Sequence, residues 1–399
     1  MSACVIGLIG VSRPIVDARG GAPPAGVSFE LPTAYVATSP VSRTLDALSL
    51  LSVSQSNAVF VSVIALFVAW AILAGRRSDG RSGWKHWAAR FAGLVVAVVI
   101  VEAVVALAPR PMARVEAGDP NVVRIDFHSH TGVSHDVRKR FTAEDNREWH
   151  RSGGFDVAYI SDHVTFGGVV AARPLNPRHA GDGTSLLSAV EGRYHKIMSV
   201  MLGLTEADTA LLNKRGNLLP GTPASGRSPV TIVTIPHRHL DSVTVQSLDS
   251  LPHFVAIELV DAAPRGLGQL DREEARIRRI ASELRFTLVA ASNNHGFGRA
   301  VAAWNLMTIP GWRDLSPDSV GRLIEAPLRD RQLDAVTIVK RARPSTHDAT
   351  LAFTLPIMAH QIVGSLTAAE RAAWLVWIWG TAAIVMYMRR RRAARAISS

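Results

Sequence analysis

The chain has 399 residues, enough for one large or two ordinary domains, and 48% of them are hydrophobic against 19% charged. This composition excludes disorder along the whole chain, and a mean hydropathy of +0.16 is high for a wholly soluble protein, so membrane spans are expected. The one cysteine, Cys4, excludes an intramolecular disulfide and zinc sites built from several cysteines.

Three apolar segments are candidates for membrane spans: residues 57–75, 91–108 and 371–388. A helix that crosses a hydrocarbon layer about 30 Å thick needs roughly 20 apolar residues. The second segment is interrupted only by Glu102, and the third carries tryptophans near its ends, as is typical of membrane interfaces. We therefore expect about three transmembrane helices, with the lipid bilayer as a partner.

Positive charge is concentrated beside these segments. The chain carries a formal net charge of +11, most of it in residues 76–90 and 389–399. Lys and Arg residues that flank a span mark its cytoplasmic side, so we expect a basic cytoplasmic loop and a basic cytoplasmic tail. Residues 1–56 are then an extracytoplasmic leader. The charge indicates topology rather than a nucleic-acid patch, and no nucleic-acid partner is expected.

Residues 346–370 are mostly uncharged, but Pro356, His360 and Gly364 suit a packed or interfacial helix better than one that faces lipid. A fourth span here would place the basic tail outside the cell. We therefore expect an integral membrane protein whose domain at 120–345 is extracytoplasmic and whose C-terminus is cytoplasmic.

The domain at 120–345 alternates short β-rich runs with helical stretches. The expected strands are 122–127, 156–161, 186–190, 230–235, 254–259, 286–291 and 335–340. Most are continuous Val- and Ile-rich runs, typical of strands buried on both faces. Strands that alternate with helices predict a parallel β/α architecture, and seven of them favour a barrel.

Helix boundaries within this domain have clear signals. Thr142 followed by Asp145 resembles a capping box, and Gly153 ends that helix. A second helix is expected to begin at Asp271. Ser316 followed by proline predicts the start of a third.

Histidines and acids follow the expected strand ends. They are His128, His130, His135, Asp162, His163, Glu191, His195, His237, His239, Asn293 and His295. One histidine after a strand is usually an ordinary loop residue, but the carboxyl ends of barrel strands open onto one face, so these residues are expected to converge. Imidazole and carboxylate without thiolate suit Zn, Mn or Fe, and so many ligands favour two or three divalent ions that activate a water.

Several of these runs resemble motifs of the polymerase-and-histidinol-phosphatase (PHP) superfamily. The sequences DFHSH at 126–130 and ISDH at 160–163 resemble its first two motifs. Glu191 resembles its third-strand glutamate, His237 its later histidine, and SNNH at 292–295 its closing Ser-Asp-x-His motif. The resemblance covers roughly residues 120–343.

The resemblance implies an α/β fold, a distorted seven-stranded barrel, with a metal cluster that usually hydrolyses phosphoesters. Its implied metal ligands are His128, His130, His135, His163, Glu191, His237, Asn293 and His295. His135 stands where the family often has Asp. Asn293 stands where it usually has a metal-binding Asp, and a neutral amide is the weaker ligand. Asp162 and His195 are the catalytic candidates; Asp162 would orient or supplement the His163 site, and His195 could instead be a ligand or hold substrate.

Arg265 and Arg299 follow two strand ends and are candidates for binding an anionic substrate, because guanidinium groups suit phosphate and carboxylate. The segment 196–229 is long for a β/α connection. We interpret it as an insertion near the site and a candidate lid.

The leading hypothesis is a membrane-anchored, metal-dependent hydrolase that acts on a small phosphorylated or other ester. The alternative is a catalytically weakened metal-binding sensor or binding domain of the same fold, which Asn293 favours. A third hypothesis is hydrolysis of an amide or another non-phosphate ester by the same cluster.

Overall fold

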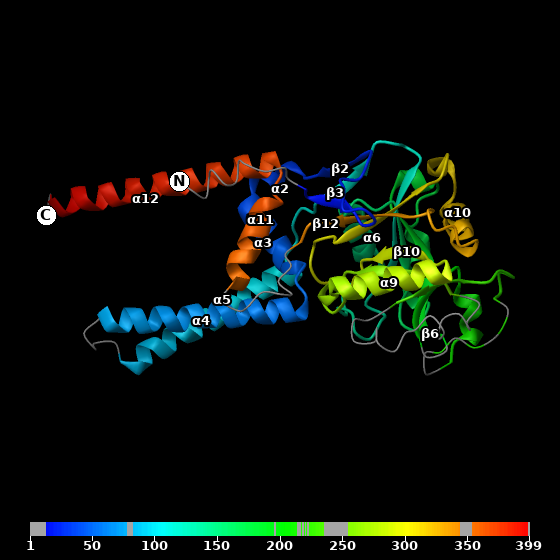
Figure 1. Cartoon of the computed structure of the whole chain (residues 1–399), viewed down its shortest axis with the longest axis horizontal. Helices are drawn as coiled ribbons and strands as arrows, with labels where there is room; N and C mark the ends of the chain where they lie inside the picture. Colours follow the sequence, from blue (N-terminus) through cyan, green and yellow to red (C-terminus); the bar gives the residue numbers. More distant parts are fainter. Residues whose placement is uncertain are drawn as a thin grey trace.

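The computed structural model describes residues 13–77, 83–194, 197–213, 217, 219, 221, 223–234, 254–343 and 353–397. It consists of a mixed α/β domain and a group of helices that extends from one end of this domain (Figure 1). The strands are β1 Ile15–Asp17, β2 Val27–Glu30, β3 Arg114–Ala117, β4 Val122–Ser129, β5 Val157–Ile160, β6 Ser185–Tyr194, β7 Ile197–Leu202, β8 Val230–Val233, β9 Phe254–Asp261, β10 Thr287–Ala291, β11 Ala303–Thr308 and β12 Thr337–Arg341.

The helices are α2 Thr33–Ala37, α3 Ser39–Ser49, α4 Val53–Arg77, α5 Trp84–Leu107, α6 Ala143–Ser152, α7 Gly167–Ala172, α9 Asp271–Leu284, α10 Pro317–Arg329, α11 Thr354–Gly364 and α12 Ala368–Ile397. Short 3-10 helices are η1 Arg173–Leu175, η2 Ala180–Asp182, η3 Glu206–Leu211, η5 Gly266–Gly268 and η6 Trp312–Asp314. The expected helix starts are present: Thr142 and Asp145 form a capping box, α9 begins at Asp271, and Ser316 caps α10.

One curled sheet of ten strands forms the core of the domain, in the order β1-β12-β11-β4-β5-β6-β7-β8-β9-β10. The strands β4, β5 and β6 are parallel, as are β8, β9 and β10, while β7 runs antiparallel between these two groups. The strands β11, β12 and β1 extend the other edge in antiparallel pairs. The core strands are almost wholly buried, which agrees with their continuous apolar sequences.

The seven-strand count from the sequence is wrong, although the barrel-like curvature is present. All seven expected strands exist, but β7, β11 and the short β1 also join the sheet. The segment interpreted as an insertion from 196 therefore begins with a strand, because β7 is hydrogen-bonded on both sides.

The side chain of Asn305 on β11 links β4 to β10, the strand at one end of the curled sheet. Its amide nitrogen donates to the carbonyls of Ile125 on β4 and Ala290 on β10, at 3.0 and 2.7 Å, and its oxygen accepts from the Ala290 N–H at 2.7 Å. A buried amide thus supplies the hydrogen bonds that a neighbouring strand would otherwise make. This contact holds the ends of β4 and β10, which carry the histidine motifs, side by side.

Residues before the first apolar helix belong to the folded domain. The strand β1 pairs with β12, and β2 pairs with β3 in a separate two-stranded sheet. Helix α3 buries the side chain of Asp46 completely, and Tyr35 is equally buried. The leader expected over residues 1–56 is therefore, from residue 15 onward, an integral part of the structure.

Three helices are long and apolar enough to cross a membrane: Val53–Ala74, Trp84–Leu107 and Ala368–Arg392. Almost none of the residues in these apolar segments are buried. All three project from the same end of the domain (Figure 1). Helix α11 has 11 residues, about 16 Å at 1.5 Å per residue, which is too short to cross a bilayer; it contacts α3 and α4.

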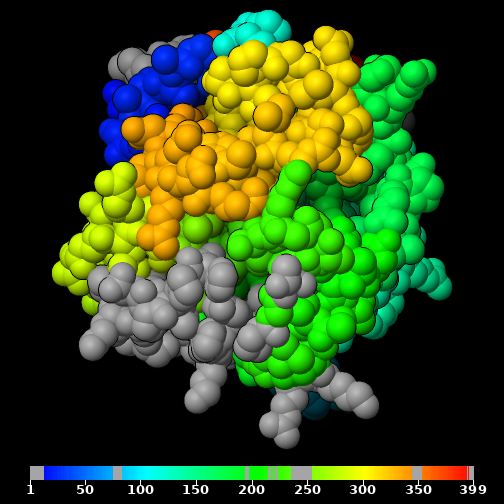
Figure 2. All heavy atoms as spheres, turned by 90° about the vertical axis from the view of Figure 1, so that its right-hand side faces the viewer, coloured from blue at the N-terminus to red at the C-terminus, as the bar shows by residue number. Residues whose placement is uncertain are grey.

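Backbone hydrogen bonds attach the first two apolar helices to the loops that follow the barrel strands. Near the C-terminal end of α5, the Ala106 carbonyl accepts from the Gly298 N–H at 2.9 Å. At the start of α4, the Val53 N–H donates to the Pro264 carbonyl at 3.1 Å. At the opposite end of the domain α10 lies at the surface, far from these helices (Figures 1 and 2).

Candidate metal centre

Strand β4 supplies two histidines that lie on the same side of the chain, as positions two apart in an extended segment do. His128 and His130 are almost completely buried, with 1% and 0% of their surface exposed. Their Nε2 atoms lie 3.0 Å apart. The lone pairs of two ring nitrogens this close repel each other unless a cation or a proton lies between them.

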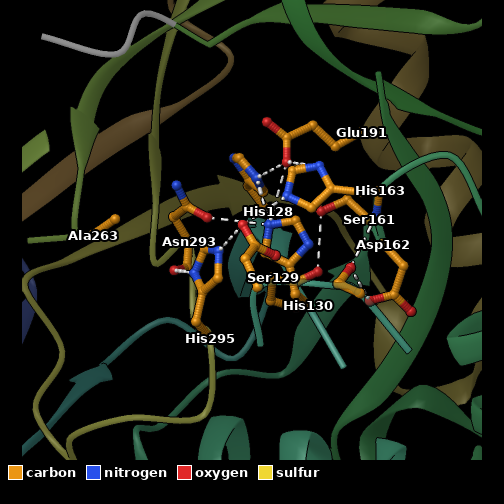
Figure 3. Close-up of polar contacts among 12 residues, drawn as sticks. His128, Ser129, His130, Ser161, Asp162, His163, Glu191, Ala263, Asn293 and His295 are labelled. Carbon is orange, nitrogen blue, oxygen red and sulfur yellow. Dashed lines mark hydrogen bonds and ion pairs between the residues drawn. The ribbon is translucent and has the colours of Figure 1, made fainter. Parts of the chain in front are cut away.

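Two neighbouring strands add the next ligand candidates. Glu191 on β6 places Oε2 at 3.2 Å from Nε2 of His128 and at 3.4 Å from Nε2 of His130. His163, which follows β5, places Nδ1 at 3.1 Å from the same oxygen. One carboxylate oxygen therefore touches three imidazoles that come from two different strand ends (Figure 3).

The loop after β10 supplies His295 and Asn293. His295 donates from Nδ1 to the Asn293 carbonyl at 2.7 Å, which leaves its Nε2 directed at Asp136, 3.3 Å away. Asp136 also lies 3.2 Å from Nε2 of His163. Asp136 thus brings a carboxylate to the cluster. The sequence had suggested its neighbour, His135, as the ligand here. His135 itself is exposed, with its ring 5.0 Å from that of His163.

Three overlapping groups of side chains can each hold a metal ion, with ligand atoms within 4.8 Å of one another. They are His130, His163 and His295; His128, His130 and Glu191; and His135, Asp136 and His163. His130 and His163 each belong to two groups, so the groups form one continuous cluster. A donor set of imidazoles and carboxylates fits Zn, Mn or Fe, and its size exceeds the needs of one tetrahedral ion.

Buried polar atoms support this fit. Among the described residues, Nδ1 of His130 and Oε2 of Glu258 are buried without a hydrogen-bond partner. Burial and the neighbouring imidazoles hold the pKa of His130 well below its usual range, so its ring is neutral and able to coordinate. Its Nε2 contacts His128, Asn293 and Glu191, so the neutral ring presents this nitrogen to the cluster.

Glu258 on β9 orients His128. Its Oε1 lies 2.8 Å from Nδ1 of His128, which fixes the Nδ1–H tautomer and leaves Nε2 free to face the cluster. Burial raises the pKa of Glu258 to about 7. Burial lowers the pKa of His128, but the carboxylates of Glu191 and Glu258 outweigh it and hold that pKa well above its ordinary value. Glu258 was not among the residues that the sequence suggested for the site.

Asn293 lies between the cluster and a carboxylate that the sequence reading missed. Its Oδ1 lies 3.1 Å from Nε2 of His130, and its Nδ2 donates to Oδ1 of Asp261 at 3.2 Å. The residue adopts φ +43°, which Asn tolerates better than most side chains. Asn293 therefore presents its oxygen to the histidines and its NH₂ group to Asp261. Two carboxylates in these positions would repel each other.

Asp162 does not face the cluster. It is fully buried and accepts from the Thr131 N–H and hydroxyl at 2.7 Å and from the Ser134 hydroxyl at 2.9 Å. The Ser134 hydroxyl in turn accepts from the His163 N–H at 3.0 Å. Figure 3 shows the Asp162 carboxylate directed away from the imidazoles. The structure thus gives Asp162 an orienting position behind His163 rather than a place among the reacting groups.

The two expected substrate arginines differ. Arg265 lies on the wall of the cavity that contains the cluster. Arg299 does not reach this cavity, because its guanidinium donates to the Arg110 carbonyl at 2.9 Å and to the Ser152 hydroxyl at 3.2 Å, which fixes it against α6. His195 and His237, with His239, lie outside the described residues.

Comparisons with known proteins give similarity of fold at low identity. No family model matches the chain, and no curated protein matches it. A lesion-specific endonuclease of Pyrococcus furiosus is 14% identical at a TM-score of 0.39, over 54% of this chain and 57% of that one. A Bifidobacterium adolescentis protein, provisionally described as a metal-dependent phosphoesterase, is 14% identical at 0.31, over 50% and 95%. These values establish no family and decide neither reaction nor substrate, so the likeness to the PHP superfamily remains a resemblance.

One of these findings corrects the expectation that nucleic acid is excluded. A second similar structure is endonuclease Q in complex with a 27-mer duplex that has an abasic lesion at the active site, with 15% identity and a TM-score of 0.37 over 51% of this chain and 56% of that one. Both endonuclease chains are longer than the part that is matched. The positive charge of the present chain had been attributed wholly to topology, and that exclusion of nucleic acid is withdrawn.

Replacing Asn293 by Asp is expected to strengthen metal binding more as pH rises. The new carboxylate would face Asp261, whose pKa burial already raises, so the two acids would share a proton at lower pH and lose it as pH rises. Metal content after dialysis, measured across a pH series, checks this. The reciprocal double variant Asn293→Asp with Asp261→Asn keeps one amide and one acid and should lose the pH dependence. A pH-independent gain in the single variant would contradict the pairing.

Proposed function

We propose that this chain is a membrane-anchored, metal-dependent hydrolase whose substrates are phosphoesters. The observation that carries the proposal is the convergence of His128, His130, His163, Glu191 and His295, from four separate parts of the sheet, into overlapping groups able to hold metal ions. Asp136 supplements them. When bound, divalent ions would supply Lewis-acid chemistry and lower the pKa of a coordinated water.

The protein's own residues have separable roles in this proposal. Glu258 and the Asn293 carbonyl hold the tautomers of His128 and His295, so that Nε2 of each faces the site. Neutral His130 is ready to coordinate without losing a proton. Burial raises the pKa of Asp136, but His163 and His295 outweigh it and hold that pKa below its ordinary value, so this exposed residue at the edge of the cluster stays a carboxylate that can supplement the metal ligands. Arg265 on the cavity wall suits an anionic substrate.

The test is metal analysis of the full chain purified in detergent, followed by a panel of substrates. The panel contains p-nitrophenyl phosphate, bis-p-nitrophenyl phosphate and a DNA duplex with an abasic site. Hydrolysis of any of these that requires metal and is lost in Glu191→Gln supports the proposal. Metal-loaded protein without hydrolysis would favour the alternative, a metal-binding sensor domain.

The proposed topology places the metal domain outside the cytoplasm and both basic segments inside. A periplasmic-type reporter that is active only outside the cytoplasm should therefore work when fused at Ser345 and fail at Ser78 or Ser399. The physical reason is the retention of Lys and Arg next to spans on the cytoplasmic side. Reporter activity at Ser399 would show that the segment around α11 crosses the membrane and that the three-span arrangement is wrong.

A further inference from the structure

A cavity connects the metal centre to the membrane helices. Its volume is about 1020 Å³. At one end its wall includes Asp136, His163 and His295 of the cluster, and at the other end residues of α4 and α5. Cavities of this size accommodate a whole small ligand with its attached groups. The proposed active site is therefore continuous with the surface of the helices that we place in the bilayer.

The position of the helix residues gives the depth of this cavity. Val53 and Asn57 belong to the first turns of α4, and Ala106 to the last turn of α5. Glu102 also lines the cavity, five residues before α5 ends, which is about 8 Å along the helix at 1.5 Å per residue. The candidate spans begin at Val53 and end at Leu107. The cavity thus reaches residues that belong to both candidate spans.

Apolar side chains lie between the cluster and the helices. Phe297, two residues after His295, lines the cavity with 53% of its surface exposed, and Val53 lines it with 49% exposed. An exposed phenylalanine beside the metal cluster contributes little to the binding of a small ionic substrate, whereas it can pack against the hydrocarbon part of a larger one.

Charged side chains occupy two other parts of the wall. Arg193 and Arg265 line the cavity and are exposed, so they provide positive charge for an anionic group. Glu102 is the one charged residue in the apolar run 91–108, a costly position unless it faces water or a polar ligand. It lines this cavity, where its carboxylate can accept from hydroxyl or amine groups of a lipid headgroup.

We propose that the substrate is a membrane phospholipid, whose phosphoester reaches the histidine cluster while its hydrocarbon chains remain along α4 and α5. This inference rests on the proposed phosphoester hydrolysis and specifies the substrate class. The same cavity admits the phosphate of a soluble ester, but only a lipid would contact Phe297 and the ends of α4 and α5 at the same time.

The first experiment compares substrates with and without hydrocarbon chains. The full-length, metal-loaded protein in nanodiscs receives dioleoyl phosphatidylglycerol or dioleoyl phosphatidic acid, and in parallel glycerophosphoglycerol or glycerol 3-phosphate. Phosphate or headgroup release should be at least about tenfold faster, as kcat/KM, for the lipid of each pair. Equal or slower release from both lipids, while the soluble esters are cleaved, would overturn the inference and leave the proposed function standing.

The second experiment narrows the passage. Ala106→Trp places a large side chain on the wall of the cavity, and the matched control Ala103→Trp lies on the same helix, exposed and away from the cavity. Ala106→Trp should lower lipid turnover at least about tenfold more than it lowers hydrolysis of bis-p-nitrophenyl phosphate, which has no hydrocarbon chain. An equal loss of both activities, or equal effects of the two variants on lipid turnover, would contradict the inference.

The third experiment does not depend on catalysis. Metal-free protein in nanodiscs is irradiated with a phosphatidic acid that carries a diazirine in one chain, and labelled peptides are identified by mass spectrometry. Labelling at Phe297, outside the membrane helices, is expected, and Ala106→Trp should remove it. Label confined to α4, α5 and α12 would overturn the inference. If no phosphoester of any kind is cleaved, the proposed function fails, and this labelling still decides whether the cavity holds lipid.

Discussion

Replacing His128 and His130 together by alanine is expected to remove nearly all bound metal and, with it, hydrolysis. The two rings provide two of the three ligand atoms in one group, and His130 also belongs to a second group. Loss of an outer partner alone typically lowers metal affinity by roughly 10–100-fold, so loss of two direct ligands should exceed about 100-fold. Metal content after dialysis against a weak chelator measures this directly.

Both rings are buried, so the double variant needs controls for folding. Glu191→Gln keeps size and hydrogen-bonding capacity but removes a ligand charge, and it should also lose metal with little change in circular dichroism. His179→Ala, at an exposed histidine paired with Asp182 away from the cluster, should retain metal fully. Wild-type metal content in the double variant would show that the histidines converge without coordinating.

Much of the sheet could be predicted, because buried parallel strands have continuous apolar sequences. The strands that were missed lack that contrast. The sequence of β7, IMSVML, can form a buried helix as well as a strand by periodicity alone. Strand β1 has three residues, and its existence depends on β12, more than 300 residues away. Pairing at such separation is determined by tertiary contacts that no local pattern contains.

The site was predictable where strand ends were predictable. His163 and His295 follow strands whose ends were located. His128 and Glu191 lie inside β4 and β6, which continue past their expected ends, and the structure brings all four residues together. Asp261 was missed because the expected strand ended at residue 259, whereas β9 continues to Asp261 and carries this side chain to the cluster's edge. Asp136 was not among the expected ligands, whereas the structure places both His135 and Asp136 in a group with His163; a loop gives no periodicity from which to predict this.

The boundary of the domain was predicted least well, because it depends on one buried ion pair. Asp46 on α3 and Arg341 on β12 lie 2.8 Å apart, and neither side chain is exposed. Asp46 also accepts from the Tyr35 hydroxyl at 2.9 Å and from Nε of Arg110 at 3.3 Å. Three segments that are distant in sequence meet at this carboxylate. A fragment restricted to 115–345 would leave Arg341 buried without its partner.

Replacing Asp46 by Ala is therefore expected to lower the free energy of unfolding of the full chain by about 3–5 kcal/mol, the usual result of removing one partner of a buried pair. Burial lowers the pKa of Arg341, but Asp46 and Tyr35 hold that pKa above its ordinary value. Without Asp46 the guanidinium, which stays protonated in proteins, would be buried with its charge unbalanced. Denaturant titration in detergent, or resistance to proteolysis, measures the loss. The matched control is Asp334→Ala, which removes the exposed partner of Arg19 and should cost less than about 1 kcal/mol. The double variant Asp46→Leu with Arg341→Met should recover much of the loss, because it removes both charges and fills the space. Equal effects of Asp46→Ala and Asp334→Ala would show that residues 15–52 are not needed for the stability of the metal domain.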